Sequence, residues 1–215
     1  MSTLKQLAIG AQEPWGARMS NTVYETLSQK IVPGLVEANN RKSKSPIKKW
    51  LGVSPSQAGS IIFGNRYEEA MNMLVEQSTD YDAITNSSTK IYITNNSQIT
   101  HRSKGNKDID ILFRHEDKIY YRESKCNLQL DSEKSKVTAS KVKDITRKLQ
   151  VLYPNYKIDA AILNMNWSGK KQFYHDVRVE YAGQFIERLG FDISEQEYKN
   201  IGKQIGRNYM EAISE

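Results

Sequence analysis

Apolar residues recur with helical spacing in several parts of the chain. A spacing of three or four residues places side chains on one face of a helix, which then packs on a core. This pattern predicts helices within residues 1–50 and 64–78, from about 139 to 152, and roughly over 177–189 and 194–213. The first three stripes are Val23, Leu27, Ile31 and Leu35, interrupted by Pro33 and Gly34; Tyr67, Met71, Leu74 and Val75; and Val142, Ile145, Leu149 and Leu152.

Other apolar positions follow the spacing of strands. Residues 108–113 and 119–125 alternate between polar and apolar side chains, and a turn at Glu116 and Asp117 predicts that they form an antiparallel hairpin. The nearly continuous apolar run over 157–165 predicts a central strand covered on both faces. Two shorter strands are predicted at 90–94 and 97–101.

The order of these elements is helix, strands, hairpin, helix, buried strand and helices. It predicts an α/β fold in which a mixed β-sheet is flanked by helices. A chain of 215 residues is expected to form one compact domain. Within that domain, we expect residues 1–55 to be a helical and basic N-terminal extension, 60–166 the core, and 172–215 a pair of C-terminal helices.

The charge balance favours an anionic partner, since the formal net charge is +6. Residues 39–50 concentrate part of this charge, and they are either a solvated linker or a strip that contacts phosphates. For each basic residue singly, a solvated surface position is the competing interpretation. The candidate phosphate contacts are Arg41, Lys42, Lys104, Lys134, Lys136, Lys141 and Arg147.

Several classes of protein do not fit the sequence. No apolar run approaches the roughly 18 residues of a membrane span, and the first residues lack a secretion signal, so we expect a cytoplasmic protein without membrane contact. The single cysteine, Cys126, excludes an internal disulfide and is expected in the core. The three histidines are too scattered for a zinc site, and no glycine-rich phosphate loop indicates a nucleotide cofactor.

The predicted hairpin carries the candidate chemistry. With its turn at Glu116 and Asp117, antiparallel pairing places Asp110 opposite Glu123 and Asp108 opposite Lys125. Opposed carboxylates repel each other, and a magnesium ion would offset that repulsion with the oxygen ligands it prefers. The alternative is an exposed sheet face with a weak surface ion pair. A register slip of the hairpin would exchange the roles of the two aspartates.

These residues resemble the core of the PD-(D/E)xK nuclease superfamily, and within it they are most similar to type II restriction endonucleases. The similarity covers about residues 64–165. The superfamily places an acid on one strand and an acid-x-lysine triplet on the next, which correspond here to Asp110 and to Glu123 and Lys125. An acid in the preceding helix often completes the site; Glu68 matches it, and Glu69 is the alternative. The chain departs from many members because no proline precedes Asp110.

The resemblance implies a restriction-endonuclease-like core that hydrolyses phosphodiester bonds in double-stranded DNA and leaves 5′-phosphate ends. It implies that Asp110 and Glu123 hold Mg²⁺, that Glu68 and Asp108 are additional ligands, and that Lys125 positions water or stabilises charge. A homodimer is expected, because a two-fold-symmetric enzyme can cut both strands of a palindrome.

Three other functions remain open from the sequence. A repair or junction nuclease could use the same fold. A DNA-binding module could hold a structural ion on its acidic face without cleaving, and a cleavage subunit could require a partner for specificity. Digestion of a defined DNA separates these alternatives, because they predict structure-dependent nicks, no cleavage, and cleavage only in a mixture.

Overall fold

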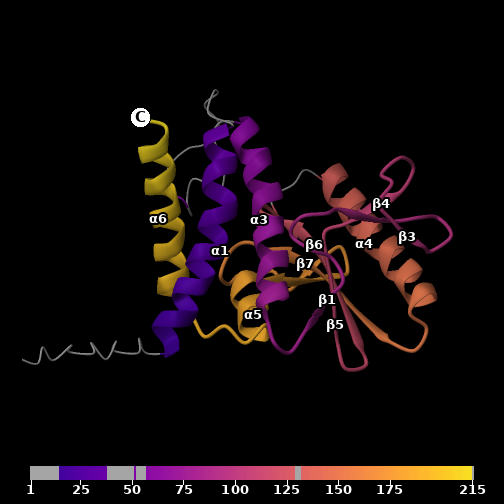
Figure 1. The fold of residues 1–215 in the computed structure, drawn as a ribbon. Coiled ribbons are helices and arrows are strands. Elements are labelled where there is room, and N and C mark those ends of the chain that lie inside the picture. Colours follow the sequence, from indigo (N-terminus) through magenta and orange to yellow (C-terminus); the bar gives the residue numbers. More distant parts are fainter. Residues whose placement is uncertain (1–14, 38–50, 52–56, 129–131, 215) are drawn as a thin grey trace, which may run out of the picture.

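The computed structural model describes residues 15–37, 51, 57–128 and 132–214, and its elements form an α/β fold (Figure 1). The helices are α1 (Trp15–Glu37), α3 (Gln57–Gln77), α4 (Ser132–Leu152), α5 (Ala182–Arg188) and α6 (Glu195–Ala212). The strands are β1 (Asp82–Ala83), β2 (Ile91–Ile93), β3 (Ile99–Thr100), β4 (Lys107–Ile109), β5 (Ile111–His115), β6 (Lys118–Lys125), β7 (Lys157–Asn164), β8 (Phe173–Tyr174) and β9 (Val177–Tyr181).

The strands form two sheets. The larger sheet is six-stranded in the order β1-β5-β6-β7-β9-β8, and the smaller is three-stranded in the order β3-β2-β4. In the larger sheet β5 and β6 are antiparallel, whereas β6, β7 and β9 are parallel, so the sheet is mixed as predicted. The apolar run expected to be central is β7, which lies between β6 and β9.

Each face of the larger sheet covers its own hydrophobic cluster. Ile111, Phe113 and Tyr120 point into a cluster with α1, α3, α5 and α6, whereas Leu112 and Tyr121 point into a cluster with α4. This alternation follows from the period of two along a strand. Figure 1 shows α1, α3 and α6 side by side, with α4 across the sheet from them. In the described part of the chain, no helix has the length and apolar character needed to cross a bilayer.

The structure corrects four predicted boundaries. Helix α3 begins at Gln57, seven residues before the predicted start at Gly64. Helix α1 continues through Pro33 and Gly34. Gly34 lies against α3, where an added Cβ would be 2.7 Å from Cγ of Arg66. Helix α4 begins at Ser132, seven residues before the predicted start at Ala139. Residues 177–181, expected to be helical, form strand β9, which contributes Val177 and Val179 to the α4 side of the core.

A group of buried ions, the Arg122 network, ties β6, β7, β9 and α5 together. Arg122 and Glu180 have no exposed side-chain surface, and Arg122 Nε donates to Glu180 Oε2. Arg122 Nη1 is 3.0 Å from Asp159 Oδ1, and Arg188 Nη2 is 2.7 Å from Glu180 Oε1. Burial alone would raise the pKa of Asp159 and of Glu180, but the neighbouring guanidinium groups outweigh it and hold both below their usual values. The network consists of Arg122, Asp159, Arg178, Glu180 and Arg188.

Candidate active site

The β5–β6 hairpin has the predicted turn and register. Its last pair is His115 with Lys118, so Glu116 and Asp117 form the turn. Its first pair is Ile111 with Arg122, which brings the preceding Asp110 next to β6. The Asp110 carboxylate is anchored there, because Ser124 N–H donates to Asp110 Oδ2 at 2.8 Å.

The first arm of the hairpin is not one strand. It breaks at Asp110, and the three residues before the break form β4, which pairs with β2 in the smaller sheet. Asp108 is paired with Tyr92. The prediction that Asp108 lies opposite Lys125 in the same ladder is therefore wrong. Alternation of polar and apolar residues continues across the break, so the sequence pattern did not reveal it.

Polar side chains from α3 and the loop after β1 hold the chain at this break. Asn72 Nδ2 donates to the Asp110 carbonyl oxygen at 2.9 Å. Thr85 Oγ1 donates to Asn72 Oδ1 at 2.5 Å and accepts from Leu112 N–H at 2.7 Å. Asn72 and Thr85 are both buried, which makes these hydrogen bonds costly to lose. The position of Asp110 is thus fixed from two sides.

Three carboxylates converge on one ammonium group from α4. Lys141 Nζ lies 2.7 Å from Glu123 Oε2, 2.9 Å from Asp108 Oδ1 and 3.3 Å from Asp110 Oδ1. Lys125 Nζ lies 2.7 Å from the other oxygen of Glu123, and Tyr121 donates its hydroxyl to Glu123 Oε2 at 2.8 Å. We call Asp108, Asp110, Glu123, Lys125 and Lys141 the acidic cluster.

Glu68, predicted from its position in the preceding helix, lies beside this cluster. A cavity of about 40 Å³, large enough for a water molecule, is lined by Glu68, Asp110 and Lys90. Lys90 Nζ is 3.6 Å from Glu68 Oε1. The alternative acid, Glu69, also lines this cavity but is paired with Arg66 at 2.8 Å. The structure therefore favours Glu68 over Glu69 as the helix residue of the site.

The nearby lysines do not fully offset burial and the mutual repulsion of the carboxylates at Asp110 and Glu68. Burial and then the neighbouring Glu123 raise the pKa of Asp110 to about 6, despite Lys141 and Lys125. Burial and then Asp110 raise the pKa of Glu68 to about 8. Asp108 differs: burial would raise its pKa, but Lys141 outweighs that and holds it below the usual value. Both Asp110 and Glu68 therefore resist ionisation, which an additional cation would reverse.

The side chains suit a hard divalent cation, because four carboxylates lie close together and carboxylate oxygens are the ligands such a cation prefers. In the described part of the chain, however, no three Asp, Glu, His or Cys side chains are arranged as a ready metal site. The ammonium group of Lys141 instead contacts three of these carboxylates. The carboxylates match Mg²⁺ in ligand type, and Lys141 Nζ lies between three of them.

The predicted phosphate contacts lie in different surroundings. Lys104 is exposed in the turn before β4, and Lys136 is exposed on α4. Lys141 lies within the acidic cluster, with 18% of its side chain exposed. Lys134 belongs to α4, but its side chain is outside the described part, and Arg41 and Lys42 lie outside the described residues.

The sequence analysis did not predict that Lys90 lies beside Glu68, or that the ammonium group of Lys141 contacts three carboxylates. Lys90 comes directly before β2, and only the pairing of β2 with β4 brings it near Glu68. Cys126, expected in the core, packs at the edge of the α1, α3 and α6 cluster. Comparisons with protein-family models, curated proteins and solved structures found no match for this chain.

Proposed function

We propose that the protein is a Mg²⁺-dependent endonuclease that cuts double-stranded DNA at specific sequences, a type II restriction endonuclease with a restriction-endonuclease-like core. The observation that carries this proposal is the placement of Asp110, Glu123 and Lys125 at the adjoining ends of β5 and β6, with an excess of buried carboxylates around them. The order and spacing of these residues support it, as does the net positive charge.

Asp110 and Glu123 would hold Mg²⁺, with Asp108 beside them and Glu68 joined through water in the small cavity. When bound, Mg²⁺ lowers the pKa of a coordinated water and neutralises charge on the phosphate. Lys141 would withdraw from its position between the carboxylates and become available to the DNA backbone. Tyr121 keeps Glu123 oriented through its hydroxyl hydrogen bond.

The reaction is hydrolysis of a phosphodiester. The oxygen of a water molecule forms a bond to phosphorus while the bond from phosphorus to the 3′ oxygen breaks, and that oxygen gains a proton. Products carry 5′-phosphate and 3′-hydroxyl ends. Lys125, 2.7 Å from Glu123, is placed to orient the water or to stabilise the negative charge that develops on the phosphate. A homodimer would present two such sites to the two strands.

Digestion of unmethylated phage DNA tests this function. The wild-type protein, Glu123→Ala and Lys125→Ala are compared with Mg²⁺ and with EDTA, and Glu211→Ala, an exposed glutamate on α6, is the matched control. We expect discrete fragments only from the wild type and the control, and only with Mg²⁺. Circular dichroism establishes that each variant is folded.

Each other outcome contradicts part of the proposal. Cleavage that survives Glu123→Ala discards the active-site assignment. A smear, or nicking confined to branched DNA, replaces sequence-specific restriction with a repair or junction nuclease. The absence of cleavage in every condition leaves a binding module or a partner-dependent subunit, and mixing with a cell extract distinguishes these two.

A further inference from the structure

A second cavity lies on the opposite side of α4 from the acidic cluster. Its volume is about 980 Å³, at the upper end of the range for ligand pockets. Lys141 and Lys143 are two residues apart on α4, a spacing that places side chains on different sides of a helix. Lys141 contacts the acidic cluster, whereas Lys143 lines this cavity. We call it the α4–β8–β9 groove, after the elements that form it.

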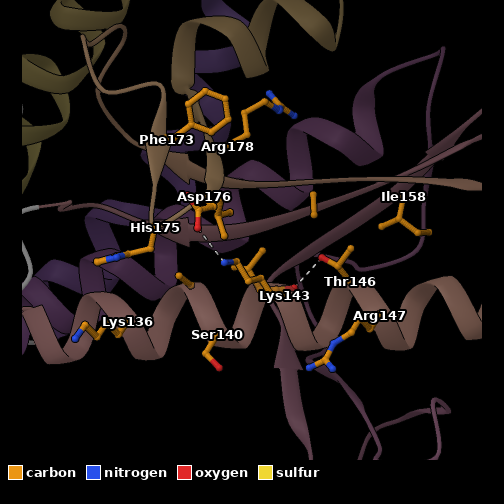
Figure 2. A pocket seen from close by; sticks show the side chains of 14 residues that line it. Lys136, Ser140, Lys143, Thr146, Arg147, Ile158, Phe173, His175, Asp176 and Arg178 are labelled. Atoms are coloured by element: carbon orange, nitrogen blue, oxygen red, sulfur yellow. Dashed lines mark hydrogen bonds and ion pairs between the residues drawn. The ribbon is translucent and has the colours of Figure 1, made fainter.

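The groove has an apolar floor and a cationic rim. Figure 2 shows Lys143 and Thr146 pointing from α4 toward the strands, with Phe173 and Arg178 on the opposite wall. The floor includes Ala139, Val142, Ile158, Ala160 and Val177. The cations that line the groove are Lys136, Lys143, Arg147 and Arg178. Three of them already contact a carboxylate: Lys143 is 3.5 Å from Asp176, Arg147 is 3.4 Å from Asp144, and Arg178 pairs with Asp159.

The wall opposite α4 is a tight hairpin that presents an aromatic ring to solvent. Phe173 is paired with Arg178 across β8 and β9, and its side chain is 61% exposed. The turn residues His175 and Asp176 both have positive φ, at 46° and 65°, as a two-residue hairpin turn requires. His175 Nε2 is 2.8 Å from Ser135 Oγ, so the hairpin is fastened to α4.

These features match one kind of ligand. An exposed aromatic ring offers a stacking surface for an unpaired base, and lysines and arginines along the rim can follow the phosphates. A duplex would leave Phe173 without a base to stack on, because its bases are already stacked on each other. A peptide whose side chains are all anionic would contact the rim cations but would have no group to stack on Phe173. The combination of apolar floor, exposed ring and cationic rim therefore favours a single strand.

We propose that the α4–β8–β9 groove binds a short segment of unpaired nucleic acid, with a base stacked on Phe173 and phosphates beside Lys143 and the other rim cations. This site is separate from the acidic cluster and does not depend on cleavage there. It would retain a displaced or unpaired strand on one side of α4 while the other side faces the acidic cluster.

Fluorescence anisotropy with labelled single-stranded oligothymidine, in EDTA, tests the proposal on the full chain. We expect Phe173→Ala to weaken binding by about tenfold and Phe173→Tyr to retain it, since tyrosine keeps a stacking ring. Lys143→Gln should weaken binding and reduce its salt dependence. Val151→Ala, an exposed apolar residue of α4 outside the groove, is the matched control and should bind as the wild type does.

Further arms separate the possible sources of the signal. Blunt duplex should bind equally to wild type and Phe173→Ala, and thymidine monophosphate should compete only weakly because it contacts few rim cations. Glu123→Ala should keep single-strand binding, so failure of the proposed nuclease function leaves this result unchanged. The proposal is overturned if the wild type does not bind oligothymidine, if Phe173→Ala binds it as tightly, or if polyglutamate displaces it equally well.

Discussion

The molecule contains two buried groups of charged side chains, and their charges are balanced differently. In the Arg122 network, three guanidinium groups surround two carboxylates, and the pKa values of both carboxylates are lowered. Around the acidic cluster, the pKa values of Asp110 and Glu68 are raised even though Lys141, Lys125 and Lys90 lie close by.

This difference separates a structural group of ions from a candidate active site. Burial of charge is common to both, so burial alone does not identify function. In the Arg122 network, each of the two carboxylates is paired with guanidinium groups of the network itself. The acidic cluster with Glu68 retains an excess of carboxylate, which costs stability unless another cation binds. That excess is the physical reason to expect a metal at one group and none at the other.

The largest expected effect comes from breaking the Arg122 network. Arg122→Met should lower the free energy of unfolding by up to about 3–5 kcal/mol, because the buried Glu180 would lose one of its two close guanidinium partners and keep only Arg188. Urea denaturation at neutral pH measures the change. Arg114→Met is the matched control, since Arg114 pairs with Asp82 on the surface of β5 and its loss should leave the midpoint unchanged. Similar losses for both variants would refute the structural role of the network.

A smaller effect is expected at the acidic cluster. Lys141→Ala should lower the free energy of unfolding in EDTA by about 1–3 kcal/mol, because three carboxylates lose their shared donor. Millimolar Mg²⁺ should restore more stability to this variant than it adds to the wild type, since the cation position is then open. Lys143→Ala, two residues along α4, is the control. Thermal unfolding that is insensitive to Mg²⁺ in both variants would contradict the metal assignment.

Glu68→Gln should raise the free energy of unfolding, whereas the two substitutions above lower it. The folded protein holds a proton on Glu68 up to a pKa of about 8, whereas the unfolded chain releases it near 4.5, so wild-type stability falls as pH rises between these values. In EDTA near pH 9, we expect Glu68→Gln to be more stable than wild type by about 1 kcal/mol or more. The advantage should vanish near pH 4. Glu69→Gln is the control, and an equal gain there would argue against the raised pKa.

The smallest effect concerns Asp159, whose side chain is 32% exposed. Its pKa is lowered, so its pairing with Arg122 and Arg178 stabilises the protein above its unfolded pKa of 3.8 and is lost as pH falls through the folded value. Asp159→Asn should cost less than about 1 kcal/mol at neutral pH after allowance for solvent screening. Denaturation curves of variant and wild type should converge in acid, and a constant difference at every pH would rule out this electrostatic origin.

Local patterns in the sequence predicted much of the fold. The stripe from Val23 to Leu35 and the alternation around Glu116 and Asp117 gave a helix and a hairpin in the right register, because both depend on nearest neighbours along the chain. The strand β9 was misjudged, since Val177 to Tyr181 runs directly into a helix and the two apolar patterns merge.

The candidate site was predicted in part. Asp110, Glu123 and Lys125 come together as the hairpin register indicated, and Glu68, chosen from the family resemblance, lies beside them. The location of Lys141 could not be predicted, because it depends on how α4 is rotated against the sheet. The placement of Asp108 in the smaller sheet could not be predicted either, because it depends on the pairing of Asp108 with Tyr92, sixteen residues earlier in the sequence.

The break at Asp110 also bears on how such a protein can change over evolutionary time. Asp110 is the one residue between β4 of the smaller sheet and β5 of the larger sheet, and its carboxylate is anchored by Ser124 and its carbonyl by Asn72. Neither anchor belongs to the smaller sheet. The segment between β2 and β4 can therefore lengthen, shorten or diversify while the Asp110 carboxylate keeps its place, whereas β4 itself is constrained because Asp108 contacts Lys141 and Ile109 packs in the core.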